Sequence, residues 1–141
     1  MKIMNKWSKR SLRNLKTCHE DLQLLANTVL RMHDCTVICG HRNEQEQNEA
    51  YYKGASKVKF PNSNHNFIIS RAIDLAPYKK GASLYDRENV LYFAGIVITA
   101  AQYLYDLDHI THKIRWGGDW DGDNNFKEHK FFDGVHFELI E

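Results

Sequence analysis

The chain has 141 residues, of which 43% are hydrophobic and 26% are charged, and its formal net charge is +1 with histidine neutral. A chain of this length can bury a core without disulfides or metals, and we expect one domain over residues 1–141. The small net charge gives no electrostatic basis for nucleic-acid binding. The longest apolar stretch, residues 93–101, is too short for a membrane-spanning helix, which needs about 20 residues.

Hydrophobic periodicity and turn-forming residues divide the chain into short elements. In chain order we expect a helix at 10–33, a strand at 35–39, a helix at 44–52, a polar loop at 57–66, a strand at 71–75, a helix at 84–106, a strand at 113–116, a loop rich in Gly, Asp and Asn at 117–130, and a strand at 135–140. The buried stripe of the last helix is expected to consist of Leu91, Ala94, Ile98, Ala101 and Tyr105. This mixture, without regular βαβ units, favours the α+β class, with a small central antiparallel sheet and flanking helices.

Cationic residues cluster near the N-terminus, and the cysteine count is odd. The cations are Lys2, Lys6, Lys9, Arg10, Arg13 and Lys16. We interpret them as a solvated helix face, with a weak anchor to an anionic surface as the alternative. No apolar segment follows them, so no signal peptide is recognisable. Cys35 and Cys39 would lie about 13 Å apart in a strand, too far for a disulfide, so we expect free thiols and a reducing compartment.

Two distant segments each hold one histidine and one aspartate: His65 with Asp74, and Asp133 with His136. A catalytic zinc needs three nitrogen or oxygen ligands and one open position for water. His65, Asp74 and His136 would make such a set. Asp133 could then take a proton from water whose pKa the metal lowers. Spacing alone leaves open a loop histidine, a turn-capping aspartate and an ordinary strand histidine.

A second metal-like pattern lies in the loop at 117–130, where Asp119, Asp121, Asp123 and Asn125 alternate around a glycine. Oxygen ligands at every second position resemble the start of a calcium loop. The residue eleven places after Asp119 is lysine rather than glutamate, so the full pattern is not met. We therefore interpret this segment as a flexible acidic turn over the mouth of the site, with a calcium loop as the alternative. We interpret the two histidines at 109 and 112 as exposed loop residues rather than as another metal site.

The segments around these residues resemble a known family of zinc peptidases. The shared residues are Ser63, His65, Ala72 and Asp74 in a first motif, Asp133 and His136 in a second, Gly40, Arg42 and Gln47 ahead of both, and the stretches 54–58 and 116–120. The family includes bacterial D-alanyl-D-alanine carboxypeptidases and phage L-alanyl-D-glutamate endolysins, with a hedgehog-like fold. Many members have six residues and a glycine between the motif histidine and aspartate. This chain has eight, with Ser70 in place of the glycine, which we interpret as a loop insertion.

The resemblance implies a role for each matching residue. It implies that His65, Asp74 and His136 bind zinc and that Asp133 is the general base. Arg42 would support the substrate or the developing oxyanion, a role that suits a permanently charged, forked donor. Four further residues are predicted to bind substrate: Ser63, Gln47, Trp116 and Trp120. The alternatives are that Ser63 braces the metal loop through a hydrogen bond and that Trp116 packs in the core.

The resemblance also implies a function. We expect a bacteriolytic phage endolysin that hydrolyses peptidoglycan stem peptides between L-alanine and D-glutamate. It would be a monomer made in the host cytoplasm, with zinc as its ion; calcium in the acidic loop is a separate hypothesis that rests on residue spacing. A separate holin would release it to the cell wall. A D,D-carboxypeptidase and a non-catalytic zinc module that binds cell wall are the alternatives.

Overall fold

The computed structural model describes residues 4–125, 127 and 131–141. The elements follow one another as α1 (Lys9–Leu15), α2 (Glu20–Leu30), β1 (Cys35–Cys39), α3 (Glu44–Tyr52), the 3-10 helix η1 (Asn64–Asn66), β2 (Ala72–Pro77), α4 (Arg87–Asp106), β3 (Lys113–Trp116) and β4 (His136–Ile140). The strands form one antiparallel sheet in the order β1-β2-β4-β3. The predicted α+β class, with a small antiparallel sheet and flanking helices, is confirmed.

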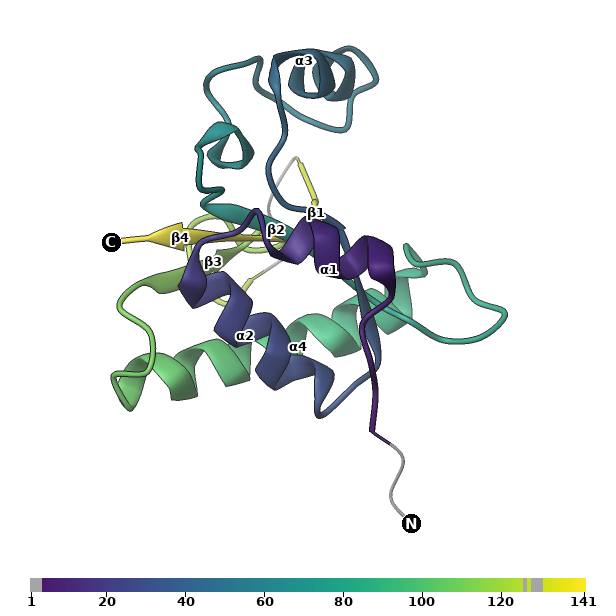
Figure 1. Ribbon diagram of the computed structural model, residues 1–141, viewed down its shortest axis with the longest axis vertical. Helices are drawn as coiled ribbons and strands as arrows, with labels where there is room; N and C mark the ends of the chain where they lie inside the picture. The colour runs from purple at the N-terminus through teal and green to yellow at the C-terminus, as the bar shows by residue number, and fades with distance from the viewer. Residues whose placement is uncertain (1–3, 126, 128–130) are drawn as a thin grey trace.

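The hydrophobic core lies between the sheet and the two longest helices. Helices α2 and α4 pack on each other and on the sheet, and Figure 1 shows α3 at the opposite end of the molecule from α4. Ile73 and Leu75 of β2 and Phe137 of β4 join this core. Because side chains alternate along a strand, their neighbours Asp74 and His136 point to the other face. Burial of the apolar residues thereby fixes the direction of two predicted ligands.

The predicted long helix at 10–33 is wrong, because the structure has two helices that are interrupted between Leu15 and Glu20. Ser70 ties down the interruption: its N–H donates to the carbonyl of Thr17, and its carbonyl accepts from the N–H of His19, both at 2.9 Å. The His19 ring then caps α2 by accepting from the N–H of Asp21. The Thr17 carbonyl and the His19 N–H are thus satisfied by a distant segment instead of by a continuing helix.

The last helix begins at Arg87, after the N-cap Asp86, rather than at residue 84. Its buried face is also rotated from the predicted stripe, since Ile98 is 41% exposed. The buried residues of α4 are Val90, Phe93, Ala94, Val97, Ala100, Ala101 and Leu104. The observed face buries Phe93, which is 1% exposed and larger than Ile98 of the predicted stripe. The helix therefore buries more apolar surface in the observed orientation than in the predicted one.

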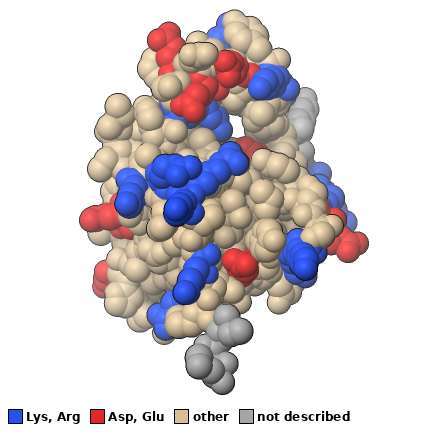
Figure 2. All heavy atoms as spheres, turned by 45° about the vertical axis from the view of Figure 1, so that its right-hand side comes forward, with Lys and Arg blue, Asp and Glu red and all other residues tan. Residues whose placement is uncertain are grey.

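All three cysteines are free thiols, as predicted. Burial raises the pKa of Cys18 and Cys35 to about 12, which keeps both thiols protonated and unreactive at neutral pH. The cations Lys9, Arg10 and Arg13 are exposed, and Figure 2 shows Lys and Arg side chains gathered on one face of the molecule. No helix in the described part of the chain is both long and apolar enough to span a membrane.

Candidate metal centre

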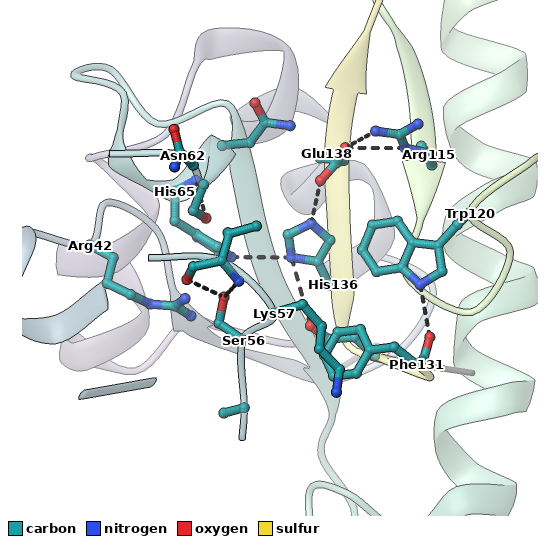
Figure 3. Close-up of a pocket in the computed structure, with 15 residues that line it drawn as sticks. Arg42, Ser56, Lys57, Asn62, His65, Arg115, Trp120, Phe131, His136 and Glu138 are labelled. Carbon is teal, nitrogen blue, oxygen red and sulfur yellow. Dashed lines mark hydrogen bonds and ion pairs between the residues drawn. The ribbon is translucent and has the colours of Figure 1, made fainter. Parts of the chain in front are cut away.

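Three predicted ligands meet at the end of the sheet nearest η1. Asp74 of β2 and His136 of β4 are direct partners across the antiparallel ladder. His65 comes from η1, where the hydroxyl of Ser63 accepts a hydrogen bond from its backbone N–H. The backbone N–H of Arg42 donates to the carbonyl of His65 at 2.8 Å and ties this turn to the segment after β1. Figure 3 shows His65 and His136 pointing toward one another.

The inward-facing atoms of the three side chains form a nearly equilateral triangle. Nε2 of His65 lies 3.2 Å from Oδ1 of Asp74 and 3.2 Å from Nδ1 of His136, and Nδ1 of His136 lies 3.3 Å from Oδ1 of Asp74. The three residues are 2%, 9% and 6% exposed for His65, Asp74 and His136. A tetrahedral zinc with ligands at 2.0–2.1 Å requires separations of about 3.3 Å between them. The donor types and their spacing therefore fit zinc.

The outward-facing nitrogens of both rings are already bound to acceptors. Nδ1 of His65 donates to the carbonyl of Gly40 at 2.7 Å, and Nε2 of His136 donates to Oε1 of Glu138 at 2.7 Å. A neutral imidazole has only one N–H, so each inward nitrogen carries a lone pair. With the Asp74 carboxylate, three acceptors face a common centre. Such a centre requires a positive charge, from either protons or a metal ion.

The pKa values of the three side chains are also shifted in the direction that favours positive charge at this centre. Burial opposes the charged form of His65, but the Asp74 carboxylate outweighs it and raises the pKa of His65 to about 10. The pKa of His136 is raised as well, against the effect of burial, by hydrogen bonds to Asp74 and Glu138. The pKa of Asp74 is lowered despite burial, chiefly by the charge of His65. A metal ion would replace these protons, so its affinity should depend on pH.

Asp133 stands beside the triangle without belonging to it. Its Oδ2 lies 4.0 Å from Nδ1 of His136. Its backbone N–H donates to the carbonyl of Gly117, whose own N–H donates to the carbonyl of His136, both at 2.8 Å. Burial, followed by the charge of Asp74, raises the pKa of Asp133 to about 6. A carboxylate with this pKa can accept and release a proton near neutral pH.

A pocket of about 410 Å³ opens onto these groups. Its walls carry Arg42, Ser63, His65, Trp120, Asp133 and His136 among the predicted site residues. Arg42 places one terminal nitrogen 3.5 Å from Oδ2 of Asp74 and donates from the other to Oε1 of Gln47. The predicted site residues left out several basic and aromatic residues of the pocket, although the stretch 54–58 shared with the family contains the first of them. They include Lys57, Arg115 and Phe131.

Gln47 does not line the pocket, contrary to its predicted role in substrate binding. It is 0% exposed. Its side-chain oxygen accepts from Arg42 and Asn66, and its nitrogen donates to the Ser56 hydroxyl and the Val58 carbonyl. Gln47 therefore holds the pocket wall and Arg42 in place, and its polar atoms are used within the protein.

Trp116 packs in the core, the alternative to its predicted role in substrate binding. It is 8% exposed, belongs to the core, and its Nε1 donates to the carbonyl of Gly134. Its ring packs edge-on against Phe132 at a centroid distance of 5.9 Å. Trp120, by contrast, lies in the pocket with its ring 5.5 Å from that of His136.

Among the described residues, two other clusters offer metal-ligand atoms that lie within 4.8 Å of one another. In the first, the Asp21 carboxylate accepts from Thr111 and His112, and His112 is half-buried rather than fully exposed. Nδ1 of His19 already accepts from the N–H of Asp21, so this cluster acts as a helix cap.

The other cluster is formed by Asp119, Asp121 and Asp123 of the predicted calcium loop. Their carboxylates accept backbone N–H groups of the same loop, including those of Asp123, Asn124 and Asn125. The loop thus forms a turn that is closed by its own carboxylates. Lys130, which departs from the calcium pattern, lies outside the described residues.

Comparisons with known proteins point to one family. The model of the family described as phage L-alanyl-D-glutamate peptidase matches residues 3–140. Among solved structures, the crystal structure of the Serratia marcescens L-Ala D-Glu endopeptidase ChiX is similar, with a TM-score of 0.69 and 25% sequence identity. The match covers 95% of this chain and 89% of the Serratia chain. No curated protein sequence matches the chain.

Proposed function

The chain belongs to the family of phage L-alanyl-D-glutamate peptidases, and from this membership we propose that it is a zinc-dependent endolysin. Its reaction would be hydrolysis of the bond between L-alanine and D-glutamate in peptidoglycan stem peptides. The observation that carries the metal assignment is the triangle of lone pairs from His65, Asp74 and His136, with separations of 3.2, 3.2 and 3.3 Å. The Serratia endopeptidase of the same fold supports the choice of bond.

Zinc would be held by Nε2 of His65, Oδ1 of Asp74 and Nδ1 of His136. Bound there, it would supply a Lewis acid for the peptide carbonyl and would make water a better nucleophile near neutral pH. The Gly40 carbonyl and the Glu138 carboxylate fix the tautomers of the two rings from outside. Mixed histidine and carboxylate sites also accept other divalent ions, so metal analysis is part of the test.

Asp133 would accept the proton of the attacking water and pass it to the leaving amine. Its raised pKa and its place at the edge of the triangle suit both transfers. Arg42 would donate to the oxyanion that develops on the carbonyl, because it stays charged and lines the same pocket. The Ser63 hydroxyl is used by the backbone of His65, so it would brace a ligand rather than contact substrate.

The decisive experiment is to incubate purified, zinc-loaded protein with cell walls and to identify the new peptide ends. A new N-terminal D-glutamate, abolished by a chelator and restored by zinc, is the expected result. Release of free D-alanine instead would identify a D,D-carboxypeptidase. Binding to walls without any new end would identify a non-catalytic module, and full activity of metal-free protein would exclude the metal mechanism.

Calcium binding by the loop of Asp119, Asp121, Asp123 and Asn125 stays a prediction. Calorimetric titration of calcium into the zinc-loaded protein tests it, and the absence of heat at millimolar calcium would remove it. The monomeric state and release by a separate holin also stay predictions.

A further inference from the structure

The charges that line the pocket are unequally neutralised. Two of its three cations face carboxylates: Arg42 lies beside Asp74, and Arg115 donates to Glu138 from Nε at 3.1 Å. The third cation, Lys57, forms no ion pair with any carboxylate in the described part of the chain. It is exposed and therefore offers the pocket a positive charge that no described side chain balances.

An aromatic wall holds this charge at a defined place. Nζ of Lys57 lies 5.2 Å from the centroid of the Phe131 ring, a cation–π distance. The Phe131 ring stacks on Trp120 at 6.3 Å with an angle of 19°, and Nε1 of Trp120 donates to the carbonyl of Phe131 at 2.8 Å. Figure 3 shows Lys57 and Phe131 close together and Arg42 apart from both.

Lys57 lines the same pocket as Asp133, the residue from which the leaving amine would receive its proton. Phe131 precedes the proposed proton donor, Asp133, by two residues, and all three side chains line the same pocket. In the proposed reaction the leaving amine belongs to D-glutamate. That residue has two carboxyl groups, and only one of them can continue the peptide chain. The other is free and negatively charged near the scissile bond.

We propose that Lys57 binds the free carboxylate of the D-glutamyl residue and thereby selects substrates in which this group is ionised. The inference rests on the proposed function and adds a specificity determinant to it. Arg42, which lies beside Asp74, is assigned to the developing oxyanion, and Arg115 is paired with Glu138. The ammonium of Lys57 is therefore the cation left for the free carboxylate. Lys57 belongs to the segment 55–58, all of whose residues line the pocket.

The test uses two peptides that differ only at this group: one with the free carboxylate, the other with a primary amide. Zinc-loaded wild-type protein should cleave the acid with a kcat/KM about fivefold higher, the factor that corresponds to ~1 kcal/mol for an accessible ion pair. The preference should shrink as salt is added. In Lys57→Gln the ratio of the two kcat/KM values should fall to about one, and in Lys57→Arg it should persist.

Lys59→Gln is the matched control. Lys59 carries the same charge two residues away, but its Nζ lies over the rings of Tyr51 and Tyr52 at 5.1 Å and it does not line the pocket. This variant should keep the wild-type ratio. Equal cleavage of both peptides by wild type, or an unchanged ratio in Lys57→Gln, overturns the role of Lys57 and leaves the proposed function standing. If wild type cleaves neither peptide, the proposed function itself fails and this inference with it.

Discussion

Glu138 accepts a hydrogen bond from Nε2 of His136 at 2.7 Å, on the edge of the imidazole opposite to the nitrogen that faces Asp74. Arg115, its partner across the β3–β4 ladder, donates to the other carboxylate oxygen. The hydrogen bond from His136, followed by Arg115, outweighs burial and lowers the pKa of Glu138 to about 2. A permanently ionised acceptor thus orients a proposed zinc ligand from behind.

Replacing this acceptor should weaken metal binding. We expect Glu138→Gln to lower zinc affinity about tenfold, because the amide keeps an acceptor atom but loses the negative charge that makes His136 a better ligand. Competition with a chelator of known affinity measures the change. Glu141→Gln is the control, since it removes the same charge from a side chain that is 95% exposed. Equal affinity in the two variants would show that Glu138 does not support the site.

Asp133→Asn should separate metal binding from catalysis. We expect zinc content to stay at the wild-type level and kcat/KM to fall about 10²- to 10⁴-fold, the usual contribution of a general base. Metal analysis and cleavage of a stem peptide measure the two properties on one preparation. Wild-type cleavage by this variant would remove Asp133 from the mechanism.

The rate should depend on pH through the same carboxylate. Burial and the charge of Asp74 raise the pKa of Asp133 to about 6, and a base must be ionised to act. Activity should therefore fall as the pH drops through this pKa, about tenfold per pH unit below it. Bound zinc favours the ionised form, so the midpoint should lie at or below about 6 in the loaded enzyme. Zinc content at each pH distinguishes this limb from loss of metal, and a midpoint well above 6 contradicts the assignment.

Gly117 has no room for a side chain. A Cβ there would lie 2.2 Å from the carbonyl oxygen of Asp133 and 3.0 Å from the Cβ atoms of Asp133 and His136. We expect Gly117→Ala to lower the free energy of unfolding by about 1–3 kcal/mol and to reduce activity, because the strain displaces both residues. Gly95→Ala is the contrasting control: its Cβ would meet nothing within 4 Å, and alanine in a helix should stabilise by about 0.5–1 kcal/mol. Chemical denaturation compares them, and a neutral Gly117→Ala would contradict this packing.

Asp21 should contribute to stability in a pH-dependent way. Although burial opposes it, hydrogen bonds from His112 and Thr111 lower the pKa of this carboxyl. Its contribution is therefore fully present above the unfolded pKa of about 4 and is lost as pH falls through the folded value. We expect Asp21→Asn to lower the free energy of unfolding by about 1–3 kcal/mol at pH 7, and by less below pH 4.

Glu20→Gln is the control for Asp21, because it removes the same charge from the first turn of the same helix but from an exposed residue. Denaturant unfolding of both variants at pH 7 and pH 3 separates the hydrogen bonds from the helix-dipole effect. Equal losses in the two variants at pH 7 would contradict the role of the buried hydrogen bonds.

The residues that meet in the candidate metal centre could be predicted from the sequence, because few side-chain types bind zinc and two segments each hold a histidine and an aspartate. Asp74 lies between Ile73 and Leu75, so strand alternation places it opposite the core. The motif around His65 and the family resemblance supplied the rest. The roles of these residues stay predictions, whereas the family and the fold class are confirmed.

The errors arise where a distant segment decides the structure. Helical spacing continues through Cys18 and His19, but hydrogen bonds to Ser70 end the helix there. Gln47 points inward because its side-chain oxygen accepts a hydrogen bond from Arg42 and its side-chain nitrogen donates one to the Val58 carbonyl. No periodicity signals such pairings, since each joins residues that become neighbours only after folding.

The pairing of Asp74 with His136 across β2 and β4 would couple binding of the proposed ion to the alignment of these strands. A slip of one residue between these strands would turn one of the two ligands into the core and an apolar side chain into the pocket. A misaligned sheet would then offer an ion too few donors to bind tightly. Because zinc would bind tightly only to the correctly aligned sheet, it would stabilise that alignment over the misaligned one.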